Sequence, residues 1–217
     1  MAEERLRFFN PFADILITGH QLPHWQQAGA TYFITFRLHD SVPAALRMKW
    51  IREREAWLLH HPYPWKPEVE REYHERFSQQ MERWLDAGHG CCLLRDGEAR
   101  AVVERTLQHF DDRRYLLHAW VLMPNHAHVL VSIREEWTLP QILHSWKSYS
   151  THALNSLLRR QGALWQEDYF DRLIRDEEHF ANCVRYIRRN PEKAHLPENE
   201  WSHHETVIAR RSLRERK

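Results

Sequence analysis

The feature that most constrains the fold of this chain is a pair of apolar stretches joined by Pro124-Asn125. Residues 114–123 read RYLLHAWVLM and residues 126–133 read HAHVLVSI, both rich in β-branched, aromatic and leucine side chains. Pro-Asn is a strong turn signal, and two β-prone stretches this close in sequence pair as antiparallel strands. The sequence therefore predicts a β-hairpin over these residues.

The rest of the chain alternates between helical and extended patterns. A strand is expected over residues 31–39, and residues 91–94 are expected to form a short strand or an extended segment. Residues 162–176 are expected to be partly extended. Helices are expected over 43–59, 68–86 (largely exposed), 97–110, 139–160 (capped by Thr138) and 177–190, the last ending at Asn190-Pro191.

This order of elements predicts an α+β fold in which a mainly antiparallel sheet packs against helices. We expect a single domain over residues 1–217, since a length-based prior of about 150 residues per domain gives one domain, or one domain with an insertion. Its core is expected over about 25–196. Residues 43–95 are interpreted as a helical elaboration inserted into that core, and the basic tail at 207–217 is expected to be frayed.

Composition excludes several classes of protein. No apolar stretch is long enough for a membrane helix, and the N-terminal residues do not resemble a secretory signal. Three cysteines, two of them adjacent, and no CxxC pattern are typical of a protein of the reducing cytoplasm. The GxxxxGK[ST] and GxGxxG phosphate-binding motifs are absent. A formal net charge of +1 by itself argues against a nucleic-acid-binding protein.

His126 and His128 are the sharpest candidate for chemistry. On a strand they project from the same face, about 6–7 Å apart, while Ala127 and Val129 project from the other. Two imidazoles on a rigid strand can chelate one divalent cation, with an oxygen ligand supplied from elsewhere in the fold. The alternative is a solvated strand face that arises by chance among 17 histidines.

Tyr186 is a candidate nucleophile. It shares a helix face with Asn190, and arginines and a lysine lie close to it in the sequence on both sides: Arg185, Arg188, Arg189 and Lys193. Guanidinium groups beside a tyrosine suggest chemistry on a phosphate, whose oxygens they can hold. The alternative is a packed aromatic ring beside a solvated basic face. Two other tyrosines, Tyr149 and Tyr169, are interpreted as structural.

Four segments together resemble a known family. MPNHAHVLV, SWKSYSTHALN, LWQEDYFDRLIRDEEHF and VRYIRRNPEKAHL occur in this order. The chain resembles the REP-associated tyrosine transposases of the single-tyrosine HUH transposase superfamily over about residues 31–196, with 43–95 the least diagnostic part. The resemblance implies a HUH, ferredoxin-like core. Ala127 departs from the bulky residue that the family carries between its two histidines.

The resemblance also implies the roles of individual residues. His126 and His128 would bind Mg²⁺ or Mn²⁺, and Tyr186 would be the catalytic tyrosine. Asn190 stands where relatives often carry a glutamine that helps to bind the metal, and it is shorter by one methylene. Arg185, Arg188, Arg189 and Lys193 would contact DNA.

The implied activity is cleavage and rejoining of single-stranded DNA beside palindromic hairpin repeats, through a 5′-phosphotyrosine intermediate. The protein would be cytoplasmic and associated with the nucleoid, as a monomer or a homodimer. Two alternatives stay open: a domesticated, non-catalytic protein that binds DNA hairpins, and a HUH replication or relaxase nickase.

Overall fold

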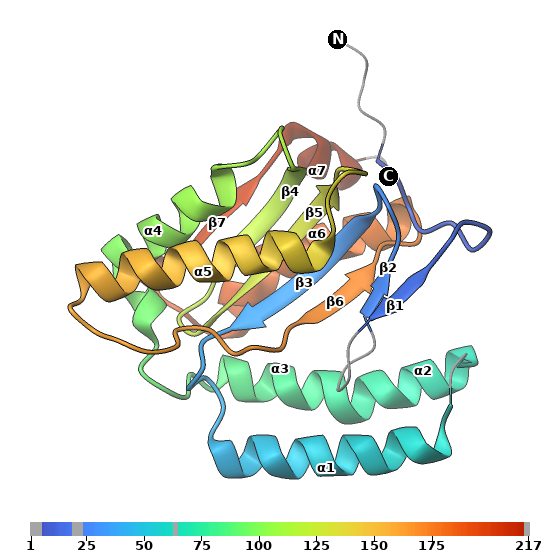
Figure 1. The fold of residues 1–217 in the computed structure, drawn as a ribbon, viewed down its shortest axis with the longest axis horizontal. Coiled ribbons are helices and arrows are strands. Elements are labelled where there is room, and N and C mark those ends of the chain that lie inside the picture. Colours follow the sequence, from blue (N-terminus) through green and yellow to red (C-terminus); the bar gives the residue numbers. More distant parts are fainter. Residues whose placement is uncertain (1–5, 19–23, 63–64, 215–217) are drawn as a thin grey trace.

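A five-stranded antiparallel sheet forms the centre of the molecule, in the strand order β6-β3-β5-β4-β7 (Figure 1). The computed structural model describes residues 6–18, 24–62 and 65–214. The strands of this sheet are β3 (Thr31–Arg37), β4 (Tyr115–Leu122), β5 (His126–Ile133), β6 (Phe170–Leu173) and β7 (Ser202–Glu205). The α+β fold with a mainly antiparallel sheet is thereby confirmed, and β4 and β5 form the predicted hairpin.

Helices cover both faces of the sheet. On one face lie α4 (Gly97–Gln108) and α5 (Leu139–Leu157), and on the other lie α6 (Glu177–Lys193) and α7 (Val207–Ser212) (Figure 1). The alternation of strand side chains supplies a separate apolar cluster to each layer. On β5, Val129 belongs to the cluster beneath α4 and α5, whereas Leu130 packs against α6.

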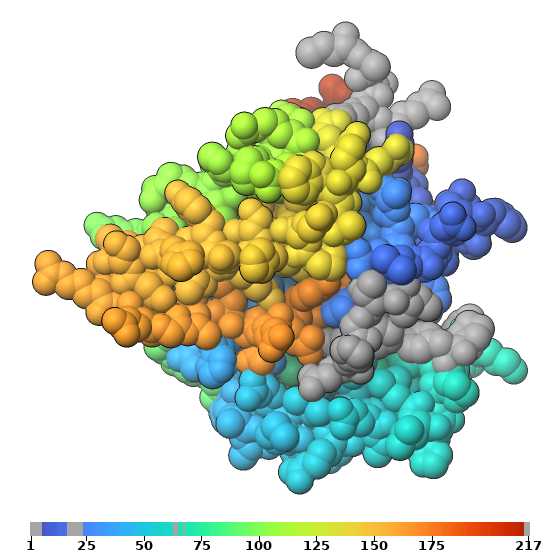
Figure 2. Space-filling view, viewed as in Figure 1, coloured from blue at the N-terminus to red at the C-terminus, as the bar shows by residue number. Residues whose placement is uncertain are grey.

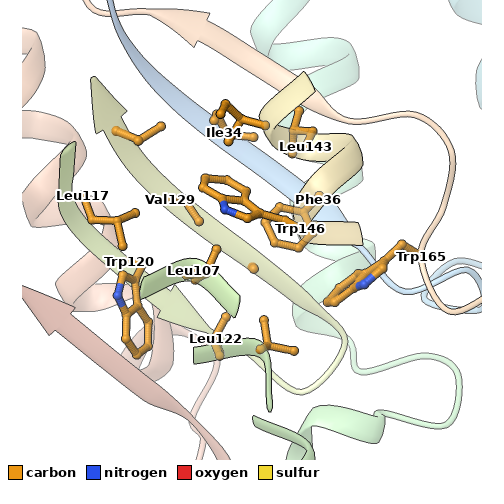
Figure 3. Close-up of a cluster of buried hydrophobic side chains, with 14 of the residues drawn as sticks. Ile34, Phe36, Leu107, Leu117, Trp120, Leu122, Val129, Leu143, Trp146 and Trp165 are labelled. Atoms are coloured by element: carbon orange, nitrogen blue, oxygen red, sulfur yellow. The ribbon is translucent and has the colours of Figure 1, made fainter. Parts of the chain in front are cut away.

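The larger cluster lies between the sheet and α5. Trp146 of α5 packs close to Phe36 of β3, and Trp165 packs edge-on against the same phenylalanine (Figure 3). The helix begins where the sequence predicts, because Thr138 and Gln141 form a capping box over its first turn. This packing fixes the position of the central strands, and with them the β5 side chains on the opposite face of the sheet.

Residues 43–95 contain a helical hairpin, which we call the insert. Its helices are α1 (Ala44–His60), α2 (Pro67–Tyr73) and α3 (Gln79–Asp86), with a π-helical segment, η1 (His74–Ser78), between α2 and α3. It has its own apolar cluster, which includes Trp50, Trp57 and Phe77. The insert lies along one side of the core, near β6 (Figures 1 and 2). The predicted exposure of 68–86 is wrong for its inner face, because Phe77, Met81 and Leu85 are buried.

The structure corrects the prediction of a strand or extended segment at 91–94. A 3-10 turn, η2 (Leu93–Arg95), follows Cys92, whose φ of 48° lies in the left-handed region. This reversal lets the chain turn from the insert into α4. Burial of the Cys92 and Leu94 side chains accounts for the apolar character that resembles a strand in the sequence.

Two predictions about the end of the helix that contains Tyr186 and about the C-terminal residues are also wrong. The helix containing Tyr186 continues through Pro191 to Lys193, because burial of the proline ring compensates for the hydrogen bond that proline cannot donate. Residues 207–212 form α7 rather than a frayed tail, since Thr206 caps the helix and Ala209 is fully buried. Residues 215–217 of the predicted tail lie outside the described residues.

Several short elements have no clear signal in the sequence. Two strands, β1 (Leu16–Thr18) and β2 (His24–Gln26), pair with each other, and a 3-10 turn, η3 (Glu198–Glu200), precedes β7. The edge strand β7 reads Ser-His-His-Glu and lacks the alternation that marks a strand. Within the described ranges, no helix has the length and apolar character needed to cross a membrane.

Tyr149 is a further correction. It was expected to pack, but its side chain on α5 is 62% exposed, and the buried face of that helix carries Trp146 instead. The outward position follows from helical geometry, because Tyr149 is offset by about 100° from the buried Ser150 that follows it.

The hydroxyl of Tyr115 provides a test of the core. It accepts a hydrogen bond from Trp146 Nε1 (2.9 Å) and donates one to the Leu107 carbonyl (2.6 Å). Tyr115→Phe should therefore lower the free energy of unfolding by about 1–3 kcal/mol, because the indole N–H is left buried without its partner. Urea denaturation measures this loss. Tyr149→Phe, on the exposed face of α5, is the control and should change stability little. An equal effect in the two variants would contradict the buried hydrogen-bond chain.

Candidate active site

His126 and His128 lie side by side on the face of β5 that α6 covers. Both are almost fully buried, and their Nε2 atoms are 3.1 Å apart. The predicted alternation is confirmed, because Ala127 and Val129 point into the cluster on the opposite face of the sheet. The two imidazoles therefore converge on one point rather than facing solvent.

Asn125 orients the first imidazole. Its side-chain nitrogen donates to the carbonyls of Leu85 and His89, both at 3.2 Å. The amide oxygen therefore faces His126 Nδ1, 2.8 Å away, and Nδ1 must carry the hydrogen because a carbonyl oxygen only accepts. The Nε2 atom of His126 is left with its lone pair free to bind a ligand.

Thr35 holds the second imidazole. It lies directly opposite His128 in the β3–β5 register, and its Oγ1 is 2.7 Å from His128 Nδ1. Asn125 and Thr35 were not identified from the sequence. Position next to His126 is the one signal that could have indicated Asn125, whereas the role of Thr35 depends on strand pairing.

Both imidazoles are neutral at ordinary pH. Burial, with a smaller effect from nearby Lys193, lowers the pKa of His126 to about 3. Burial also lowers the pKa of His128 well below its usual value, with smaller effects from His126 and Lys193. A neutral imidazole is the form that binds a metal ion.

Tyr186 lies against the histidine pair. Its ring meets the ring of His128 edge-on, with centroids 5.1 Å apart, and meets Phe33 at 5.6 Å. Burial raises the pKa of the phenol, and the Glu82 carboxylate raises it further. The hydroxyl is therefore protonated in the free protein and must lose its proton before it can act as a nucleophile.

Asn190 is buried one helical turn after Tyr186, with 1% of its surface exposed. Its amide lies near enough to the phenol to lower the pKa of Tyr186 slightly. Neither the nitrogen nor the oxygen of that amide makes a hydrogen bond of normal geometry within the described part of the chain. A buried amide without such a bond is costly unless another partner satisfies it.

The donor set fits a divalent cation. It comprises two neutral imidazoles with converging nitrogens and, one layer away on α6, the unsatisfied Asn190 amide. Among the described residues, no group of three or more histidine, cysteine, aspartate or glutamate side chains is arranged to hold a metal. An amide oxygen is therefore the candidate third protein ligand.

The four basic residues that were predicted to contact DNA differ in their position relative to Tyr186. Arg188 lies about 200° around α6 from Tyr186, where it forms a bidentate ion pair with the buried Glu205 of β7. Arg185 donates to Asn182 Oδ1 (2.6 Å), and Arg189 is exposed. Lys193 alone among them lies over the Tyr186 ring, at 6.0 Å.

Carboxylates from the insert also reach the site. Lys193 Nζ is 3.2 Å from Asp86 and 3.8 Å from Glu82, both on α3. Glu82 is close enough to Tyr186 for each group to influence the pKa of the other. No motif in the insert indicated this proximity, which depends on how α3 packs against α6.

Comparisons with known proteins identify the region that carries this site. A family model described as "Transposase IS200 like" matches residues 94–190. This segment includes both histidines, Tyr186 and Asn190, and it excludes α1, α2 and α3. The family match confirms the resemblance to transposases that was predicted from the four sequence segments.

Individual relatives are distant. An uncharacterised protein of Haemophilus influenzae is 23% identical, over 46% of this chain and 76% of that protein. Among solved structures, the REP-associated tyrosine transposase bound to a REP hairpin has 20% identity and a TM-score of 0.44, covering 81% of this chain and 74% of the other. A protein of Deinococcus radiodurans R1 described as a candidate transposase has 13% identity and a TM-score of 0.34, covering 81% and 98%.

The buried histidines predict loss of stability in acid. His118, on β4, is hydrogen-bonded to Ser132 Oγ (2.7 Å), and burial lowers its pKa to about 4. An unfolded histidine has a pKa of about 6.5. Between these values the unfolded chain binds more protons, so stability is complete above pH ~6.5 and falls as the pH decreases toward 4. One such histidine removes on the order of 2 kcal/mol at pH ~5.

Urea unfolding of the metal-free protein at pH ~7 and pH ~5 measures this effect. His118→Gln should show a smaller difference between the two pH values than the wild type, because glutamine does not titrate. The same change at the exposed His203 of β7 is the matched control. An unchanged pH dependence in His118→Gln would contradict the assignment.

Proposed function

We propose that this protein is a metal-dependent DNA transposase that cleaves and rejoins single-stranded DNA through Tyr186, beside palindromic hairpin repeats. The observation that carries the proposal is the edge-on contact between the Tyr186 ring and His128, at 5.1 Å. It brings a candidate nucleophile onto a converging pair of neutral imidazoles. The family match supplies the transposase class. Tyrosine chemistry, the metal and the hairpin substrate are the proposed additions.

His126, His128 and the Asn190 amide oxygen would hold Mg²⁺ or Mn²⁺. Such a cation, when bound, polarises a phosphoryl oxygen and helps to orient the scissile phosphate. Asn125 and Thr35 keep the two Nε2 atoms directed toward each other, so the chain does not have to reorganise these ligands.

Tyr186 performs the covalent step. Its oxygen forms a bond to phosphorus while the bond from phosphorus to the 3′ oxygen breaks, giving a 5′-phosphotyrosine and a free 3′-hydroxyl. The phenol gives up its proton, and the departing 3′ oxygen gains one. Rejoining reverses these changes and consumes no nucleotide, because the energy of the phosphodiester is kept in the covalent intermediate.

Lys193 is the cation best placed to meet the DNA backbone at this site. It lies over the Tyr186 ring and is half exposed, with two carboxylates as its present partners. Arg185 and Arg189 lie on the same helix and could contact phosphates farther from the reacting centre. Arg188 is already committed to Glu205, so its contribution to DNA binding would require that ion pair to open.

The tyrosine assignment predicts a covalent adduct. Wild-type protein incubated with single-stranded hairpin DNA and Mn²⁺ should give a protein–DNA band that resists denaturing electrophoresis. Tyr186→Phe should give none yet bind the same DNA with similar affinity, because only the nucleophilic oxygen is removed. Tyr149→Phe, at an exposed position, is the control. An adduct that persists in Tyr186→Phe would move the nucleophile to another tyrosine.

The ligand assignment predicts loss of metal binding. His126→Ala and His128→Ala should each bind Mn²⁺ at least ~10-fold more weakly by isothermal titration, and both should lose adduct formation. His203→Ala is the matched control on an exposed strand position. Cleavage that continues unchanged in chelator would refute the metal role.

The same assays distinguish the remaining alternatives. Hairpin binding without any adduct in the wild type would indicate a domesticated DNA-binding protein. An adduct formed equally well on DNA without a palindromic repeat would favour a replication or relaxase type of nickase.

A further inference from the structure

A cavity of about 490 Å³ lies between the insert and the core, and Tyr186 is part of its wall. The core contributes residues from β2, β3, β6 and α6, and the insert contributes residues from α1, α2, η1 and α3. Its volume is within the range of small-molecule sites. The family match begins at residue 94, so the insert side of this cavity lies outside the matched segment.

Aromatic rings line the cavity on both sides. Trp25 and Tyr169 stand on the core side, and Trp65 and Tyr73 stand on the insert side. The Tyr169 ring is stacked on His24, with centroids 4.1 Å apart and planes 18° from parallel. Flat aromatic walls favour a flat aromatic ligand, and a nucleobase offers such a face whatever its identity.

A buried contact between two polar side chains supports this arrangement. The His24 and Asp171 side chains, 8% and 5% exposed, are in direct contact in the cavity wall. Because Tyr169 stacks on His24, the pair holds that ring in a fixed orientation. Rigid aromatic walls lower the cost of ordering the site when a ligand binds.

Two arginines of the core also line the cavity. Arg172 donates to the ring of His74 at 3.0 Å, and Arg175 forms an ion pair with Glu70. Both partners lie on the insert, and both arginines are largely exposed. Guanidinium groups prefer phosphate, with which they form bidentate hydrogen bonds. A phosphate at the cavity mouth would compete with Glu70 for Arg175.

We propose that this cavity is the binding site for an unpaired nucleotide of the DNA strand that Tyr186 attacks. The base lies among the aromatic rings, and the phosphate is held by Arg172 and Arg175. The inference rests on the proposed function, because the tyrosine in the cavity wall is what ties the occupant to the cleaved strand. The insert then contributes to substrate binding and is more than a packing element.

Photo-crosslinking tests the location directly. A short oligothymidylate with one thymidine replaced by 5-iododeoxyuridine is irradiated with the full-length Tyr186→Phe protein, and the attached peptides are sequenced. Crosslinks are expected at the cavity rings, above all at Tyr169, Tyr73 or Trp65. Crosslinks confined to the outer surface of α6 and α7 would overturn the proposal.

Variants test the contribution of the base. Tyr169→Ala should weaken binding of oligothymidylate about 5-fold or more, yet leave binding of an abasic strand of equal length unchanged. Tyr149→Ala, on the far helix α5, should change neither. Ser78→Trp, which fills the cavity from η1, should abolish the difference between the two strands. If Tyr169→Ala weakens both strands equally, the ring does not bind a base.

Removing the charge of Glu70 should change DNA affinity in a direction that a packing role of Arg175 would not predict. Glu70→Gln should raise the affinity for oligothymidylate, because Arg175 is released to a phosphate. Unchanged or weaker binding would remove Arg175 from the proposed site. Thermal unfolding of each variant checks that it is folded, and the crosslinking map of the Tyr186→Phe protein covers the case in which one is not.

The crosslinking assay and the adduct assay test the two proposals separately. Adduct formation without cavity crosslinks would leave the transposase function standing and refute the nucleotide site. Cavity crosslinks without an adduct from the wild type would leave a DNA-binding cavity and refute the tyrosine chemistry.

Discussion

The rest of the structure depends on the burial of β5 on both of its faces. Every residue of this strand is buried, yet it carries two histidines and a serine. On one face Ala127 and Val129 join the apolar cluster beneath α4 and α5. On the other, the polar groups need partners, which Thr35, Asn125 and His118 supply. A buried polar group without a partner costs free energy, so these contacts select one register and one orientation for each ring.

The same burial sets the chemistry of the candidate site. Away from water, the two imidazoles stay neutral, and the lone pair of His126 Nε2 points toward His128. Burial also keeps the Tyr186 phenol protonated. The two imidazoles are therefore in the form that can bind a cation, and the phenol stays a weak nucleophile until it loses its proton.

The insert contacts the candidate site and its surroundings in three places. The Asn125 amide donates to the Leu85 and His89 carbonyls, so the orientation of His126 depends on the end of α3. Asp86 and Glu82 hold Lys193. Farther along, η1 and α2 close the aromatic cavity. A part of the chain that the sequence presents as a helical elaboration thus contributes to the surroundings of His126, of Tyr186 and of the cavity.

The sequence by itself determined the local elements and the candidate residues for chemistry. Periodicity and turn signals were enough for β3, for the β4–β5 hairpin and for the main helices, because these depend on contacts between residues close in the chain. The spacing of His126 and His128 placed both rings on one face for the same reason. Tyr186 and Asn190, one helical turn apart, were likewise assigned to one face of a helix.

The tertiary structure decided which distant groups meet. Thr35 opposes His128 because of strand register, and Lys193 meets Glu82 because of how α3 packs on α6. The helix α6 continues through the buried Pro191 to Lys193, beyond the end that the sequence predicts. The short strand β7 has no apolar alternation and exists because β4 offers it an edge. Pairing and packing between segments far apart in the chain leave no periodic signal in either segment, so only the folded molecule shows them.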